Sequence, residues 1–250
     1  MTPAKALPHA NLAEGLAELQ REVEALNHIE KAIELNPSSA QLRLNSAFTL
    51  LALGRYRDGW TAYEARLAPE IPDSPQRALD MPRWDGESLD KKHILVCSGQ
   101  GTGDQLFFGA YLPGLVNRAA GATVETDPRL VQLFQRSLPT ARVRPFSRRV
   151  AGLKPILTYG WVPRGEDAPD CYIDIACLPL LSGDTHENPV APGRFLVPDP
   201  GVVKAWRGAA REFVRRPAGG RVVLAQRIDH SGAREILSDH RAMGAIAHLG

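Results

Sequence analysis

Residues 93–113, HILVCSGQGTGDQLFFGAYLP, decide how the chain folds and where its chemistry lies. The short apolar run at residues 94–97 predicts a buried strand. Three glycines follow at alternate positions, and an apolar segment predicted to be helical begins at Asp104. In a strand–turn–helix unit of this kind, glycines let backbone N–H groups approach a ligand at the helix N-terminus. The sequence therefore predicts a ligand site at this turn, with the Asp104 carboxylate at its mouth.

The overall composition is that of an ordinary soluble globular protein. The chain has 250 residues, enough for one or two domains, with 44% hydrophobic and 23% charged residues. Its net charge of +2 does not indicate a nucleic-acid or membrane partner. The arginines of residues 142–149 are interpreted as a solvated face, with phosphate binding as the alternative. No apolar run approaches about 20 residues, so no membrane span and a cytoplasmic location are predicted.

The three cysteines exclude a disulfide framework and favour a reducing compartment. Cys97 is predicted to be a small core residue within the first strand. Cys171 and Cys177 have the same sequence parity as two nearby isoleucines, which predicts that they point into the core from one strand. Neither a CxxC motif nor a histidine lies at ligand spacing, so no metal site is predicted.

The first seventy residues show the apolar spacing of helices. One segment with this spacing ends at Asn36-Pro37, a helix stop. A second segment aligns with the first at a shift of 34 residues. In this superposition Ala25 matches Gly59, and such small residues allow paired helices to approach closely. Arg66 stands at a position where a small residue is usual.

This period and pattern resemble the tetratricopeptide repeat. The resemblance is carried by ALNHIEKAIELNP at residues 25–37 and LALGRYRDGWTAYEARL at residues 51–67. Stacked repeats of this kind present a surface that binds peptides, so a peptide or protein partner is expected there. Two repeats are fewer than the three or so needed for stability, which predicts that residues 1–72 pack against the following domain. An ordinary amphipathic helical hairpin is the alternative interpretation.

The remainder predicts an α/β fold. Residues 73–92 form a proline-rich connector that is expected to pack Trp84 in the protein rather than to stay free. Strands then alternate with helices, which predicts a mostly parallel, Rossmann-like sheet domain over residues 93–218 and the start of another domain at 219–250. Strands are predicted at 93–97, 122–125, 142–146, 171–175 and 222–225, and helices at 104–120 (broken or restarted at Pro113), 128–137 and 199–215.

A longer stretch of the sequence around this turn resembles a bacterial family that joins tetratricopeptide repeats to a glycosyltransferase domain of the GT-B type. That family is related to heptosyltransferases and more distantly to O-GlcNAc transferase. The resemblance rests on WDG at residues 84–86, QGTGD at 100–104 and the aromatic segment that reaches Pro113. It covers roughly residues 25–245 and implies the acceptor-side half of a GT-B fold. The donor-binding half would begin at residue 219 and be incomplete at Gly250, since domains usually hold about 100–150 residues.

The resemblance implies transfer of a sugar from a nucleotide-diphosphate sugar to a hydroxyl acceptor, without a metal or other cofactor. Asp104 matches the general base, and a helix N-terminus would keep its carboxylate ionised. An N-cap of the helix is the alternative role for Asp104. Gly99 departs from the family, which has an acidic residue there. The residues expected to bind substrate are Gly101, Thr102, Gly103 and Gln105, and those expected to contact the donor diphosphate are Arg227 and Arg234.

Three functions stay open at this point. The first is an inverting, metal-independent glycosyltransferase, and the second is a repeat scaffold that lacks catalysis because its donor half is cut short. The third is an NAD-type dinucleotide-binding protein. Glu125 closes the second strand, where a ribose-binding acid would lie, but Asp104 replaces a glycine of the dinucleotide fingerprint.

Overall fold

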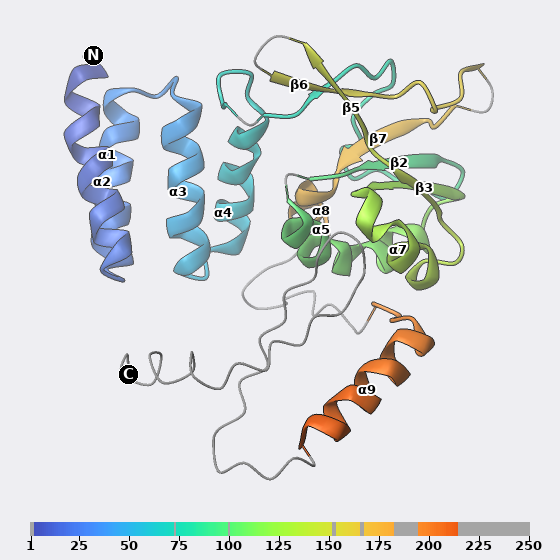
Figure 1. Ribbon diagram of the computed structural model, residues 1–250. Coiled ribbons are helices and arrows are strands. Elements are labelled where there is room, and N and C mark those ends of the chain that lie inside the picture. Colours follow the sequence, from blue (N-terminus) through green and yellow to red (C-terminus); the bar gives the residue numbers. More distant parts are fainter. Residues whose placement is uncertain are drawn as a thin grey trace. The chain divides into compact units, whose positions relative to one another are not determined.

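The computed structural model describes residues 3–72, 74–99, 101–151, 154–165, 168–182 and 195–214. The chain divides into two compact units, Met1–Asp199 and Pro200–Gly250. The first unit holds the helical region, the connector and the sheets (Figure 1). The described part of the second unit is helix α9, Pro200–Val214. Among the described residues, no helix is both long and apolar enough to span a membrane.

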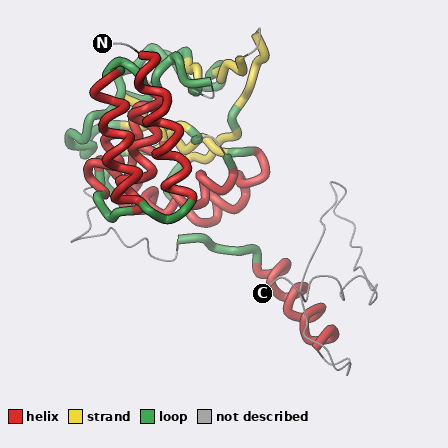
Figure 2. The backbone as a smooth tube through the Cα atoms, turned by 90° about the vertical axis from the view of Figure 1, so that its left-hand side faces the viewer, coloured by secondary structure: helices red, strands yellow, loops and turns green. Residues whose placement is uncertain are grey.

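Four helices and a short 3-10 turn form the helical region. They pack as two neighbouring hairpins, α1 with α2 and α3 with α4 (Figures 1 and 2). Helix α2 ends just before Pro37, and Ser39 caps α3 by accepting a hydrogen bond of 3.3 Å from the Leu42 N–H. Gly54 follows α3 at a φ of +73°, which favours glycine. The bounds are α1 Pro3–Glu18, α2 Glu22–Leu35, α3 Ala40–Ala52, α4 Tyr56–Tyr63 and η1 Glu64–Leu67.

Small side chains allow these helices to lie close together. Ala25, Ala32 and Ala47 are fully buried. Gly59 lies in α4, where an added Cβ would approach Leu51 Cγ to 2.7 Å. The predicted match of small residues at Ala25 and Gly59 therefore corresponds to close helix packing.

The main sheet has four parallel strands in the order β4-β3-β2-β7. Strands β3 and β4 lie on one side of β2, and β7 pairs with β2 on the other side. The strand order therefore reverses between β2 and β7, and ligands of open α/β sheets bind at the carboxyl ends of strands at such a switch point. The bounds are β2 His93–Cys97, β3 Gly121–Thr126, β4 Arg142–Pro145 and β7 Cys171–Asp174.

The helix after β2 begins two residues earlier than predicted and has three parts. Gly101 is its N-cap, so Asp104 is the third helical residue rather than the cap. A 3-10 turn separates α5 from α6, which places Pro113 in the first turn of α6, where a missing N–H is tolerated. The predicted restart at Pro113 is thus confirmed. The bounds are α5 Thr102–Phe108, η2 Gly109–Tyr111, α6 Leu112–Val116, η3 Pro128–Leu130 and α7 Val131–Ser137.

The strand at residue 171 is one residue shorter than predicted. Asp174 ends β7 and caps the 3-10 turn η5 by accepting from the Ala176 N–H at 3.0 Å. Cys177 therefore lies in η5 and not on the strand, which corrects the shared-strand prediction. Cys97, Cys171 and Cys177 are all buried free thiols, as their predicted core positions require. The bounds are η5 Ile175–Cys177 and α8 Leu178–Leu181.

A second sheet was not predicted. Its three strands follow the order β1-β6-β5 and comprise β1 Gln76–Arg77, β5 Ser147–Ala151 and β6 Lys154–Thr158. Leu157 and Tyr159 pack with Leu95 and Cys97 in a shared apolar cluster. The connector is also packed in place, because Trp84 is 3% exposed and donates from its indole to the Glu87 carbonyl at 2.9 Å.

The helical region packs against the sheet domain, as expected. Trp60 of α4 belongs to the same apolar core as the strands of the main sheet. Its ring lies 5.9 Å from that of Phe108, with an edge-to-face tilt that favours aromatic pairs.

Two glycine substitutions test the packing of the helical region. In Gly59→Ala the clash with Leu51 costs roughly 1–3 kcal/mol, more than the ~1 kcal/mol that alanine gains over glycine in a helix. We expect a lower free energy of unfolding in urea. Gly15→Ala in α1 is the matched control, because nothing lies within 4 Å of an added Cβ. It should stabilise the protein by about 0.5–1 kcal/mol, and equal effects of both variants would contradict the packing argument.

Candidate functional site

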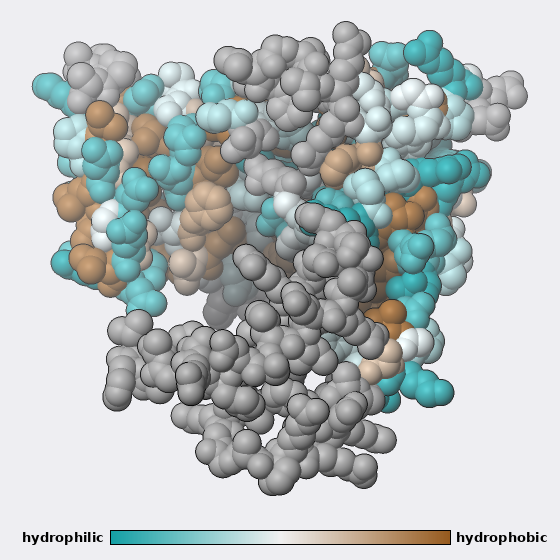
Figure 3. Space-filling model, viewed as in Figure 1, coloured by the Kyte–Doolittle hydropathy of each residue, from teal (hydrophilic) through white to brown (hydrophobic). Residues whose placement is uncertain are grey.

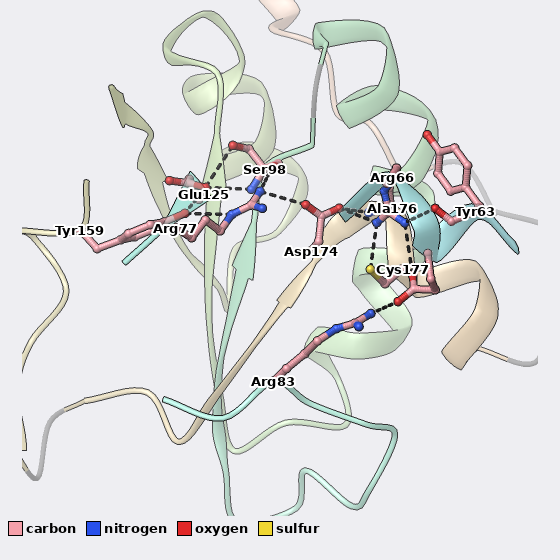
Figure 4. Close-up of polar contacts among 11 residues, drawn as sticks. Tyr63, Arg66, Arg77, Arg83, Ser98, Glu125, Tyr159, Asp174, Ala176 and Cys177 are labelled. Carbon is pink, nitrogen blue, oxygen red and sulfur yellow. Dashed lines mark hydrogen bonds and ion pairs between the residues drawn. The ribbon is translucent and has the colours of Figure 1, made fainter. Parts of the chain in front are cut away.

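A small pocket lies at the switch point, where β2 and β7 end. It leaves room for on the order of one water molecule. The helical region, the connector and the segments after β2 and β7 all line it, and Figure 4 shows several of these residues. The lining residues are Tyr63, Arg66, Pro75, Gly99, Asp104, Phe108, Asp174 and Ala176.

Asp104 is held at the edge of this pocket by the start of α5. Its Oδ2 accepts a hydrogen bond of 2.9 Å from the Gly101 N–H. A Cβ at Gly101 would lie 3.1 Å from that oxygen, so glycine makes the close approach possible. The half-buried carboxylate lies in the first turn of α5.

Of the other predicted substrate residues, none lines the pocket. Thr102 accepts from Arg129 Nη2 at 2.7 Å, and Gly103 is exposed. Gln105 is 1% exposed, and its side-chain oxygen accepts from the Thr126 hydroxyl and the Asp127 N–H, both at 2.8 Å. Gln105 therefore ties α5 to the end of β3 rather than facing a ligand, which corrects its predicted role.

Both predicted donor-binding residues, Arg227 and Arg234, lie outside the described residues. The predicted strand at 222–225 and the predicted domain at 219–250 also lie outside them. Among the residues that the structure describes, no cluster of histidine, cysteine and acidic side chains could hold a metal ion.

Glu125 at the end of β3 is engaged by the protein itself. It is 1% exposed, and its Oε2 accepts from the N–H and the hydroxyl of Ser98 at 2.9 and 3.0 Å. The Tyr159 hydroxyl lies 3.4 Å from the same oxygen. Burial raises the pKa of Glu125, although the Ser98 hydrogen bonds and the charge of Arg77 act in the opposite direction. This placement argues against a role for Glu125 in binding a ribose.

The most heavily paired group at the site is the Asp174 carboxylate. Arg66 Nη2 lies 2.9 Å from its Oδ1, and Arg77 Nη2 lies 2.9 Å from its Oδ2 (Figure 4). Arg66 comes from the helical region and Arg77 from the connector, so this carboxylate joins both to the end of β7. Sequence reasoning missed the cluster, although Arg66 had already broken the repeat pattern.

Further contacts fix both guanidinium groups. Arg66 also bonds Cys177 Sγ at 2.9 Å and Glu64 Oε1 at 3.2 Å. Its guanidinium carbon lies 4.6 Å from the centre of the Tyr63 ring, a cation–π geometry. Arg77 donates from Nε to the Tyr159 hydroxyl at 3.0 Å.

The guanidinium groups of Arg66 and Arg77 are charged at neutral pH. Burial alone would lower the pKa of Arg66 and of Arg77, but the Asp174 carboxylate outweighs it and both pKa values rise. Burial raises the pKa of the Cys177 thiol to about 12, so the thiol is protonated and a weak nucleophile.

One protein similar to this chain is Protein FlbA of Caulobacter vibrioides (strain ATCC 19089 / CIP 103742 / CB 15). The two are 29% identical over 211 residues, which cover 80% of this chain and 34% of FlbA. The chain thus spans about a third of the length of this relative. No family model matches the chain, and no solved structure matches it.

Removing the charge of Asp174 should destabilise the fold strongly. In Asp174→Asn the two buried guanidinium groups lose their counter-charge, at an expected cost of about 3–5 kcal/mol in urea unfolding. Asp58→Asn is the matched control, because Asp58 pairs with Arg55 on the surface and its side chain is 55% exposed. The control should change stability by about 0–1 kcal/mol. Similar losses of unfolding free energy in both variants would show that burial of Asp174 does not increase its contribution to stability.

Glu125 should give stability a distinct pH dependence. A raised pKa means that the folded state favours the protonated carboxyl, so its contribution is present at low pH and is lost as pH rises through the folded pKa. We expect the unfolding free energy of the wild type, relative to Glu125→Gln, to fall as the pH rises above the ordinary glutamate pKa of about 4.5. Urea titrations at increasing pH measure the difference, and a flat or rising difference would refute the assignment.

Proposed function

We propose that the protein is a glycosyltransferase of the GT-B type that moves a sugar from a nucleotide-diphosphate sugar to a hydroxyl acceptor, with Asp104 as general base. The observation that carries the proposal is the Asp104 carboxylate at the switch-point pocket. Asp174 lines the same pocket, but Arg66 and Arg77 bind its two oxygens. Asp104 has only one oxygen bound among the described residues, by the Gly101 N–H. It is therefore the carboxylate with capacity to accept a proton.

The proposed reaction uses this position directly. The acceptor hydroxyl gives its proton to Asp104 while its oxygen forms a bond to the anomeric carbon of the donor. The bond from that carbon to the diphosphate breaks, and the nucleoside diphosphate leaves with the bonding electrons. Gly101 and Gly103 precede Asp104 and have no side chains that would crowd an acceptor beside the carboxylate, and the start of α5 holds it in place. The resemblance of residues 54–113 to GT-B enzymes with appended repeats supports this assignment.

Asp104→Asn tests the proposal. Asparagine keeps an oxygen for the Gly101 N–H but cannot take up the acceptor proton, so we expect sugar transfer to fall by about 10²–10⁴-fold. Release of nucleoside diphosphate from a panel of UDP-, GDP- and ADP-sugars measures the reaction. The melting temperature should change little, since a first-turn charge contributes about 0.3–1 kcal/mol.

Asp58→Asn provides the activity control, because it removes an exposed carboxylate that pairs with Arg55 and does not line the pocket. It should leave transfer unchanged. Full activity in Asp104→Asn, or no binding and no turnover of any sugar donor by the wild type, would overturn the proposal.

A repeat scaffold without catalysis is the second candidate, and exposed apolar side chains on the helices favour it. Leu7, Leu12, Leu19, Val23 and Phe48 are 49–69% exposed. Apolar surface is visible over the helical region in Figure 3. Scattered single apolar residues are normal on surfaces, so this observation is weaker than the placement of Asp104. Calorimetry that detects a bound peptide but no nucleotide sugar would favour the scaffold.

A further inference from the structure

The pocket beside Asp104 is too small for the ligand that the proposed function requires. It holds on the order of one water molecule, whereas ligand pockets commonly measure about 300–1,000 Å³. If the pocket is a sugar-transfer site, the structure therefore represents its closed state. The question is which side chains occupy the missing space.

Two of the lining side chains belong to the helical region, Tyr63 and Arg66. The others lie in the connector and in the sheet domain. We propose that residues 63–67, the gate segment, close the site and move away to admit ligand, with the Arg66–Asp174 ion pair holding them shut. This inference rests on the proposed function, because only a ligand larger than water requires the gate to open.

The charge arrangement makes this ion pair suited to reversible opening. When Arg66 leaves, Asp174 keeps its 2.9 Å ion pair with Arg77. Arg66 in turn keeps its bond to Glu64, which lies on the same 3-10 turn and moves with it. Opening therefore leaves neither charge buried without a partner, which is the costly outcome in the breakage of a buried ion pair.

The reactivity of the Cys177 thiol shows whether the gate segment is open or closed. Cys177 is 0% exposed, and Arg66 Nη2 contacts its sulfur at 2.9 Å. Cys97 and Cys171 lie instead on strands of the main sheet, and they are 0% and 2% exposed. Opening of the gate segment exposes the Cys177 thiol, whereas global unfolding exposes all three thiols.

The experiment is alkylation of the native protein by iodoacetamide, followed by cleavage before aspartate residues. Residues 90–103, 170–173 and 174–183 then carry the three cysteines on separate peptides for mass spectrometry. In the wild type we expect Cys177 to react at least about tenfold faster than Cys97 and Cys171, since local opening needs less free energy than unfolding. Arg66→Met should raise the Cys177 rate by a further factor of about ten or more and leave the other two rates unchanged.

Arg55→Met is the matched control, because Arg55 pairs with Asp58 on the surface just before α4. It should leave all three rates unchanged. Equal rates at the three thiols in the wild type, or a joint rise of all three in Arg66→Met, would overturn the gate. Should Arg66→Met fail to fold, the wild type alone tests the gate. Local opening exposes less surface than unfolding, so the labelling rate of Cys177 should rise less steeply with urea concentration than the labelling rate of Cys97.

The outcome separates the gate from the proposed function. Selective labelling of Cys177 without turnover of any sugar donor leaves a mobile gate and overturns the transferase. Sugar transfer without selective labelling of Cys177 leaves the transferase and overturns the gate.

Discussion

The structure depends on one carboxylate, Asp174, held between two buried guanidinium groups. Removing charges from water costs several kcal/mol per ion even after relaxation, so such a cluster persists only when its geometry satisfies every partner. Here Arg66 and Arg77 each lie 2.9 Å from a different oxygen of Asp174. One guanidinium comes from the helical region and the other from the connector. The same interaction therefore joins the helices, the connector and the sheet within one compact unit.

In the proposed mechanism, this pairing leaves Asp104 as the acid at the switch point that can take up a proton. Glu125, Asp104 and Asp174 lie near the carboxyl ends of neighbouring strands, and each has a different environment. Glu125 is buried against Ser98, Asp174 is fully ion-paired, and Asp104 is half-buried with one bound oxygen. A group that must gain and lose a proton during a reaction cannot also be the structural counter-charge for two buried arginines. The division of roles follows from the environments alone.

Local patterns predicted the elements well, because apolar periodicity and punctuation by proline and glycine act within a few residues. The parallel strands, the helical character of the first seventy residues and the restart at Pro113 belong to this group. The three-stranded sheet was missed because β1 has two residues and because β5 (SRRVA) and β6 (KPILT) do not alternate apolar and polar residues. Gln105 was misassigned because neighbouring helical residues point about 100° apart, so the residue after Asp104 faces the core. The ion pair between Arg66 and Asp174 spans 108 positions, beyond the reach of local reasoning.

The sequence nevertheless holds a local signal of this ion pair, because Arg66 departs from the repeat pattern for a physical reason. The repeat pattern calls for a small residue there, because the next helix of a stacked array packs closely against that position. An arginine at the same position would bury an unpaired charge in an apolar helix interface, which disfavours another repeat on this face. Asp174 supplies the missing counter-charge from the sheet domain instead. A residue that breaks a local rule thus marks the junction at which the helical region ends and the candidate site begins.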